Sequence, residues 1–170
     1  PMGSGSGPFA YRLLGQMCAA LQEHGRTWAP PPGSDLRTWD RVFYYQEDLG
    51  PVIIENPLYS HLFDKARVSA IRRAIALSEE VINESYDAEA PQLVHGDLHE
   101  WNVHMAGSRL YAFDFEDVMI ALPAQDVSVC LYSSRNSEIR DDIRAAFRRG
   151  YESVAPWPVF LRMRPRSPTG

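Results

Sequence analysis

The fold and chemistry of this chain are decided by two stretches, Leu93-Val-His-Gly-Asp-Leu-His-Glu-Trp-Asn-Val103 and Phe113-Asp-Phe-Glu116. Within them Asp97 and Asn102 lie five positions apart, and Asp114 comes twelve residues after Asn102 at the end of an apolar run. Phosphoryl transfer requires groups of this kind. One carboxylate orients the attacking hydroxyl, while an amide oxygen and a second carboxylate hold Mg²⁺ on the phosphates. The spacing therefore predicts a phosphotransferase.

The same layout occurs in the protein-kinase pattern H-R-D-L-x-x-x-N followed by D-F-G, with Gly96 here in place of Arg and Glu116 in place of Gly. Asp97 heads a loop after a short predicted strand, where a side chain can project into a cleft, and we interpret it as the catalytic base. We interpret Asn102 and Asp114 as Mg²⁺ ligands, because a carboxylate that leaves an apolar strand is costly without a cation or a network. Taken singly, Asp97 is better explained as a solvated loop residue, and Asn102 is also explained as a turn former. Their joint spacing favours a function.

Neighbouring acidic residues receive supporting assignments. Glu116 and Asp117 add charge beside Asp114 and are candidates for holding the metal or a substrate amine, although both are also explained as solvated side chains. Asp126 follows Pro123 at the start of a predicted helix, where the helix dipole favours a carboxylate. We expect Asp126 to have a structural role, as a buried brace of the catalytic loop.

The histidines of the motif allow a second interpretation. His95, Asp97 and His99 alternate along an extended stretch and would share a face, which is typical of a transition-metal site, with His104 as a further ligand. No Cys or His cluster elsewhere in the sequence completes a tetrahedral set. We favour a packed His95 that positions the loop backbone by hydrogen bonding, with His99 also supporting the catalytic loop.

The composition limits the class of protein. The 170 residues carry a net charge of −5, which argues against a nucleic-acid-binding surface. No stretch approaches the ~20 apolar residues that cross a bilayer, so we expect a cytoplasmic protein without membrane contact. Cys18 and Cys130 lie in apolar helical contexts and are expected to be buried free thiols. Lys65 is the only lysine in the chain.

The spacing of apolar residues predicts the secondary structure. Helices are expected over residues 8–24, 59–86, 123–134 and 137–153, and short strands over 91–95, 102–105 and 110–115. The last two strands are expected to form a hairpin about Ala106-Gly-Ser108, and this small β-hairpin insertion is expected to carry the catalytic loop. Residues 26–58 are expected to be mostly loop. We therefore expect an α+β, mainly helical domain over residues 8–160, between a linker or cloning remnant at 1–7 and a disordered tail at 161–170.

With these residues identified, the chain resembles the aminoglycoside phosphotransferase superfamily over roughly residues 9–158. This superfamily includes choline, homoserine and fructosamine kinases. His95-Gly-Asp-Leu-His99 with Asn102 is similar to the catalytic loop of the family. Phe113-Asp-Phe-Glu-Asp117 with Leu122-Pro-Ala-Gln-Asp126 is similar to its metal-binding segment. The resemblance implies a protein-kinase-like fold, ATP as co-substrate, a catalytic aspartate in the matched loop, and Mg²⁺ on the matched asparagine and aspartate.

Two further stretches, Trp28-Ala-Pro-Pro-Pro-Gly33 and Gly150-Tyr-Glu-Ser-Val-Ala-Pro156, resemble the homoserine-kinase-type and stress-response-kinase-like branch. Members of the family also have an N-terminal lobe with a β-sheet, a phosphate-covering loop and a lysine. Nothing in this sequence corresponds to that lobe, and Lys65 falls on a predicted helix of the other one. The resemblance thus implies a C-terminal lobe with the N-terminal lobe absent. Its exposed former interface is expected to favour a homodimer.

Three functions compete at this point. The first is ATP- and Mg²⁺-dependent phosphoryl transfer to a hydroxyl of a small polar substrate, for which the acidic residues hint at an amine-bearing molecule. We expect this reaction to be incomplete in the chain by itself. The second is a non-catalytic binding or scaffold remnant of a kinase-like protein. The third is a metal-dependent hydrolase that uses His95, Asp97 and His99. The catalytic-loop motif favours the first.

Overall fold

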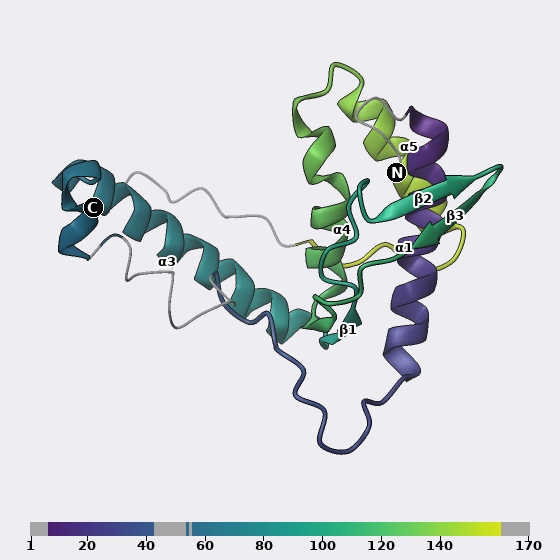
Figure 1. Ribbon diagram of the computed structural model, residues 1–170, viewed down its shortest axis with the longest axis horizontal. Helices are drawn as coiled ribbons and strands as arrows, with labels where there is room; N and C mark the ends of the chain where they lie inside the picture. Colours follow the sequence, from purple (N-terminus) through teal and green to yellow (C-terminus); the bar gives the residue numbers. More distant parts are fainter. Residues whose placement is uncertain (1–6, 43–53, 55, 161–170) are drawn as a thin grey trace. The chain divides into compact units, whose positions relative to one another are not determined.

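The computed structural model describes residues 7–42, 54 and 56–160 (Figure 1). Apart from Gly7, the predicted linker at 1–7 and the predicted tail at 161–170 lie outside the described residues. The chain divides into two compact units, each described by itself below. Unit 1 comprises Pro1–Thr38 and Ala90–Val159, and unit 2 comprises Trp39–Glu89 and Phe160–Gly170.

Helix α1, Pro8–Thr27, is the longest helix of unit 1 (Figure 1). Pro8 occupies its first turn, where a missing backbone N–H costs nothing. Leu14 and Cys18 lie on its fully buried face. The helix ends before Trp28, whose backbone is extended, because the prolines that follow cannot continue a helix. The helix predicted over 8–24 is confirmed and is three residues longer.

The two helices predicted after the motif are also confirmed. Helix α4 spans Pro123–Tyr132, the 3₁₀ turn η2 spans Ser133–Asn136, and α5 spans Arg140–Glu152. Pro123 again fills the first helical position, and the side-chain oxygen of Gln125 accepts a 2.8 Å hydrogen bond from the backbone N of Leu122. This cap fixes the start of α4 directly after the short strand Met119–Ala121.

Helices α1 and α5 pack against each other through glycine. A Cβ on Gly15 would overlap the carbonyl oxygen of Phe147, and a Cβ on Gly150 would overlap the carbonyl oxygen of Arg12. Each glycine therefore lets the backbone of the other helix come into direct contact. Trp157 closes the end of this pair, with its ring edge-on to those of Phe147 and Tyr151.

Four short strands form two antiparallel pairs. β1, Gln92–Val94, pairs with β4, Met119–Ala121, and β2, Val103–Ala106, pairs with β3, Arg109–Ala112. The predicted hairpin is confirmed, and Gly107 supplies the positive φ of +62° that its tight turn requires. β4 was not among the predicted strands. The catalytic loop lies between β1 and β2, immediately before the hairpin instead of within it.

The core of unit 1 lies between α1, α4, α5 and the hairpin. Its largest fully buried side chains are Tyr11, Phe147, Leu14, Leu98, Met119, Val103 and Val127. Cys18 and Cys130 are both fully buried and free, as predicted. The expected α+β, mainly helical class is thus confirmed.

Unit 2 contains the 3₁₀ helix η1, Pro57–Leu62, and the long helix α3, Lys65–Ala88 (Figure 1). The single helix predicted over 59–86 is therefore wrong in one respect, because the chain breaks at Asp64. The Asp64 side chain caps α3 by accepting a 2.8 Å hydrogen bond from the backbone N of Arg67. No side chain of α3 is buried. In the described part of the chain, no helix combines the length and apolar content that crossing a membrane requires.

Candidate active site

The candidate site is built on the loop that joins β1 to β2. Gly96 turns the chain there with φ of +83°, a left-handed conformation that suits glycine. A Cβ at this position would overlap the carbonyl oxygen of Asp117 and would lie 2.8 Å from Met119 Cε. The absence of a side chain therefore lets the loop pass directly against the segment that enters β4.

Asp97 and Asn102 are joined by one side-chain amide. Asn102 Nδ2 donates to Asp97 Oδ2 at 2.8 Å and to the Asp97 carbonyl oxygen at 2.9 Å. Because both N–H groups of the amide are engaged, its oxygen is directed away from Asp97. The Asp97 side chain is 37% exposed, whereas Asn102 is 6% exposed. The two residues thus present an accessible carboxylate beside a fixed amide.

Asp114 leaves the hairpin at the same end. Phe113 N donates to the carbonyl oxygen of Asn102 at 3.1 Å, which extends the β2–β3 ladder by one residue pair. Asp114 follows with φ of +64°, the one positive φ of a non-glycine residue among those the structure describes. This conformation costs on the order of 1–2 kcal/mol for a residue with a Cβ, and such strain clusters at functional sites. The backbone pairing and the turn bring Asp114 to the end of the ladder that holds Asn102.

The fully buried carboxylate of Asp126 holds the catalytic loop in place. Asp126, on the first turn of α4, accepts a 3.0 Å hydrogen bond from Gly96 N at Oδ1. Burial raises the pKa of Asp126, and the hydrogen bond from Gly96 and the neighbouring His95 oppose that rise. Asp126 therefore contacts the loop at Gly96, the residue directly before Asp97.

Sequence reasoning missed the residues that hold Asp126. Gln22, on α1, directs Nε2 to Asp126 Oδ2 at 3.4 Å and to the Pro123 carbonyl oxygen at 3.1 Å. Tyr151, on α5, donates its hydroxyl to Gln22 Oε1. A buried chain of polar groups thus runs from α5 through α1 and α4 to the catalytic loop. The available signal was a glutamine at helical spacing within an apolar stripe, four residues after Cys18.

The histidines do not form the transition-metal site considered from the sequence. His95 Nδ1 accepts from Asp97 N at 3.4 Å, so its Nε2 carries the proton that is donated to the Phe113 carbonyl oxygen at 3.2 Å. His99 Nδ1 accepts from Trp101 N at 3.1 Å, which leaves the protonated Nε2 facing Asp97 Oδ2 at 3.3 Å. His104 lies on β2, exposed to solvent. Among the described residues no group of three His, Cys, Asp or Glu side chains is arranged to hold a metal. Both loop histidines are instead used to fix the backbone.

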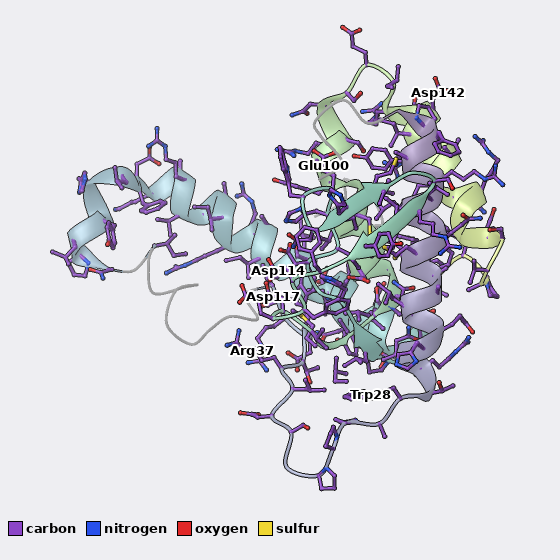
Figure 2. The ribbon with its side chains drawn as sticks, turned by 45° about the vertical axis from the view of Figure 1, so that its right-hand side comes forward. Trp28, Arg37, Glu100, Asp114, Asp117 and Asp142 are labelled. Carbon is purple, nitrogen blue, oxygen red and sulfur yellow. The ribbon has the colours of Figure 1, made fainter. Side chains whose placement is uncertain are left out.

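The remaining acidic residues separate into two groups. Glu116 is exposed and Asp117 is half-buried in the loop after β3. Figure 2 shows Asp117 on the same side as Asp114. Glu100, which the sequence analysis did not single out, is 5% exposed and accepts a 3.0 Å hydrogen bond from the Tyr11 hydroxyl. Burial raises the pKa of Tyr11 to about 12, so this phenol remains a donor at neutral pH. Glu100 thereby ties the catalytic loop to the first turn of α1.

A cavity of about 210 Å³ lies beside the loop in unit 1. Its walls include Trp28, His24, Val118 and the rings of His95 and Phe115, whose centroids are 4.6 Å apart. The cavity is mainly apolar. It therefore lacks the ligand set that a phosphate or a metal would require.

A carboxylate, an amide and a second carboxylate thus lie together at the end of a hairpin that adjoins a helical core. This arrangement is typical of kinase-like phosphotransferases. Comparison with known families agrees. The family description "Phosphotransferase enzyme family" (APH) matches residues 8–165. The chain belongs to this family, and with it to the aminoglycoside phosphotransferase superfamily.

Two individual proteins are similar to the chain. An uncharacterized protein of Synechocystis sp., sll1119, is 28% identical over 148 residues, which cover 86% of this chain and 39% of that protein. The structure of amicoumacin kinase hAmiN in complex with AMP-PNP, Ca²⁺ and Ami superposes with a TM-score of 0.67 at 18% identity, over 89% of this chain and 45% of that one. The likeness to hAmiN supports the kinase-like fold. The chain spans less than half the length of either protein.

Proposed function

We propose that this chain transfers a phosphoryl group from ATP to a hydroxyl of a small polar substrate. The observation that carries the proposal is the geometry of Asp97, Asn102 and Asp114 at one end of the β2–β3 ladder. The donor set fits a divalent cation, because carboxylate and amide oxygens are ligands that Mg²⁺ prefers. Asn102 would offer Oδ1 and Asp114 its carboxylate. Mg²⁺ bound there would neutralise charge on the phosphates during transfer.

Asp97 is proposed to orient the attacking hydroxyl. Its Oδ2 is held by Asn102 at 2.8 Å and by His99 Nε2 at 3.3 Å, which leaves Oδ1 to accept the proton of the substrate. Gly96, tied to Asp126, fixes the backbone from which Asp97 projects. The reacting oxygen would therefore meet a carboxylate whose position is set before the substrate binds.

We further propose that the chain corresponds to the helical, C-terminal lobe of a kinase-like fold and that the substrate carries an amine. The first proposal is supported by the helices α1, α4 and α5 around the catalytic loop and by a match confined to 45% of hAmiN. The second is supported by Asp114, Glu116 and Asp117, which give the edge of the site a negative charge. A cationic amine would be attracted to this edge.

Binding of Mg²⁺–AMP-PNP to the full chain, measured by calorimetry, tests the metal and nucleotide part of the proposal. We expect Asp114→Asn to weaken binding at least tenfold. Asp142→Asn is the matched control, because this exposed carboxylate lies on the first turn of α5, well separated from Asp114 in Figure 2. Equal affinities of the wild type and Asp114→Asn would contradict the assignment, as would no binding by the wild type.

The role of Asp97 is tested separately by ATP consumption in the presence of a panel of amino alcohols and aminoglycosides. Asp97→Asn should keep Mg²⁺–AMP-PNP affinity within about threefold and lose phosphoryl transfer, because it removes the proton acceptor and leaves the metal ligands in place. A variant that still transfers phosphate at the wild-type rate would exclude Asp97 as the orienting group.

A further inference from the structure

The indole of Trp101 lies exposed in the middle of the catalytic loop. Trp101 is 52% exposed, whereas its neighbours in the chain, Glu100 and Asn102, are 5% and 6% exposed. In the described part of the chain, no aromatic ring stacks on this indole and no cation lies over it. A single exposed apolar side chain is common on protein surfaces. The position of this ring therefore matters more than its exposure.

The imidazole of His99 connects the backbone of Trp101 to the carboxylate of Asp97. Trp101 N donates a hydrogen bond to His99 Nδ1 at 3.1 Å, and His99 Nε2 faces Asp97 Oδ2 at 3.3 Å. Only this one ring separates the Trp101 backbone from the carboxylate that is proposed to orient the hydroxyl. Trp101 is therefore held next to the place where an acceptor hydroxyl would bind.

The backbone is fixed on both sides of Trp101. Before it, the buried carboxylate of Glu100 accepts a 3.0 Å hydrogen bond from the Tyr11 hydroxyl. After it, Asn102 donates to the carbonyl oxygen of Asp97 at 2.9 Å and to its Oδ2 at 2.8 Å. A tryptophan that projects from such a turn loses little further conformational entropy when a ligand binds. Trp101 thus offers a pre-organised contact surface.

The chemistry of the ring and its surroundings favours a cationic ligand. Among aromatic side chains, tryptophan attracts a cation over its face most strongly. Asp97 and Asp114 add negative charge on the same loop and at the end of the adjoining hairpin, which raises the local concentration of cations. The chain contains one contact of this kind, since the Arg135 guanidinium lies 3.9 Å from the centroid of the exposed Tyr132 ring. The face of Trp101 is therefore suited to a cation from solution.

We propose that Trp101 determines specificity for the phosphate acceptor. Its indole face binds a protonated amine of the substrate while a hydroxyl of the same molecule lies at Asp97. The inference rests on the proposed phosphotransferase function, and it adds a contact residue to the acidic edge of the site. It narrows the substrate class to amino alcohols and amino sugars, in which an ammonium group and a hydroxyl share a small carbon skeleton. Trp101 does not touch the reacting atoms, so it acts on binding and not on the chemical step.

Steady-state kinetics with the panel of amino alcohols and aminoglycosides tests this role. Trp101→Leu keeps an apolar side chain and removes the π face. We expect it to raise KM for amine-bearing acceptors about 5–30-fold, the range of a partly to fully desolvated cation–π contact. The kcat and the KM for ATP should stay within about twofold. Trp101→Phe should recover part of the loss, because it restores an aromatic ring.

Neutral acceptors separate a cation–π contact from apolar packing. N-acetylation removes the positive charge of each amine and leaves the hydroxyls of the molecule in place. Trp101→Leu should therefore change kcat/KM for the N-acetylated acceptors by less than about twofold. Equal losses for the amines and their N-acetylated forms would show that the ring acts only as an apolar surface and would overturn the proposal.

Tryptophan fluorescence locates the amine without requiring turnover. The same amines, added without ATP, should quench the wild type and Trp28→Phe but not Trp101→Phe. Trp28 is a matched control because it is also exposed and follows the last turn of α1, about 25 Å along the helix axis from the Tyr11 that holds Glu100. Figure 2 shows Trp28 and Glu100 well apart. Far-UV circular dichroism checks that the variants keep their helices.

The two experiments distinguish this inference from the proposed reaction. Quenching through Trp101 without phosphoryl transfer would support the role of Trp101 and contradict the reaction. Phosphoryl transfer in which Trp101→Leu keeps the wild-type KM for amines would overturn the role of Trp101 and leave the reaction standing. Amines that quench none of the proteins, or that quench Trp101→Phe as strongly as the wild type, would also overturn the proposal.

Discussion

Replacing Gly96 by alanine should loosen the catalytic loop far more than the same change at another left-handed glycine. Gly96 has φ of +83° and its missing Cβ would overlap the Asp117 carbonyl oxygen, with Met119 Cε at 2.8 Å. Gly107 has φ of +62°, and nothing lies within 4 Å of a Cβ built there. The two positions share the backbone conformation and differ in the space around it, so Gly107→Ala is a matched control.

The expected magnitudes follow from this difference. A left-handed conformation costs alanine about 1–2 kcal/mol, of which about 0.4–1 kcal/mol is offset by the reduced entropy of the unfolded chain. We therefore expect Gly107→Ala to lower the free energy of unfolding by about 1 kcal/mol. Gly96→Ala adds a steric conflict with backbone, which costs about 1–3 kcal/mol more. The difference between the two variants should be about 1–3 kcal/mol.

Urea unfolding followed by far-UV circular dichroism measures both variants. Since the slope for small domains is about 1–3 kcal/mol per molar urea, the midpoint of Gly96→Ala should lie roughly 1 M below that of Gly107→Ala. Mg²⁺–AMP-PNP affinity should fall in Gly96→Ala and remain unchanged in Gly107→Ala. Equal midpoints for the two variants would refute the argument that the loop depends on close approach at Gly96.

Two further predictions concern buried polar groups. Tyr11→Phe removes the donor to the buried Glu100 carboxylate and should lower the free energy of unfolding by about 1–3 kcal/mol, measured by heat or urea. The control Tyr111→Phe, at an exposed position, should change this free energy by less than about 0.5 kcal/mol. Similar values for the two variants would contradict the role given to Glu100. Asp126→Asn places an amide N–H against the donors Gly96 N or Gln22 Nε2 and should cost about 1–3 kcal/mol. Burial raises the pKa of Asp126 above the ordinary value of 3.8. The folded wild type is therefore most stable relative to Asp126→Asn when Asp126 is protonated, and it loses part of this difference in unfolding free energy as the pH rises through the raised pKa. The penalty of Asp126→Asn, measured over a series of pH values above 3.8, should therefore decrease as the pH rises, and a penalty that grows with pH would show that Asp126 is stabilised as a carboxylate.

The sequence was sufficient to predict those elements whose structure depends on residues close together in the chain. Helix α1 was predictable because its apolar residues recur at helical spacing and a proline run follows it. The hairpin was predictable because a glycine turn separates two apolar stretches. β4 was not, because Met119-Ile-Ala121 is too short to show a period and becomes a strand only by pairing with β1. The break at Asp64 was missed because the apolar residues of η1 continue the spacing of those in α3.

The residues of the candidate site also fall into those that the sequence reveals and those that it does not. Asp97, Asn102 and Asp114 stand out because their spacing is tied to their chemistry. Gln22 and Tyr151 do not, because their partners lie about a hundred or more residues away in the sequence and each falls on an apolar helical face. Tyr11 and Glu100 were missed for the same reason, since one hydrogen bond joins positions 89 residues apart. Spacing reveals groups that act on a ligand, while the groups that hold them appear only after folding.

The glycine contact between α1 and α5 has a consequence for the synthesis of the chain. These helices are the first and the last in the sequence of unit 1, and α3, the catalytic loop and α4 are all synthesised between them. At typical ribosomal rates of ~5–20 residues per second, α1 waits roughly 5–25 s for its partner. During that time Leu14 and Cys18 have no α5 to pack against. We therefore expect nascent chains to depend on chaperones until α5 emerges.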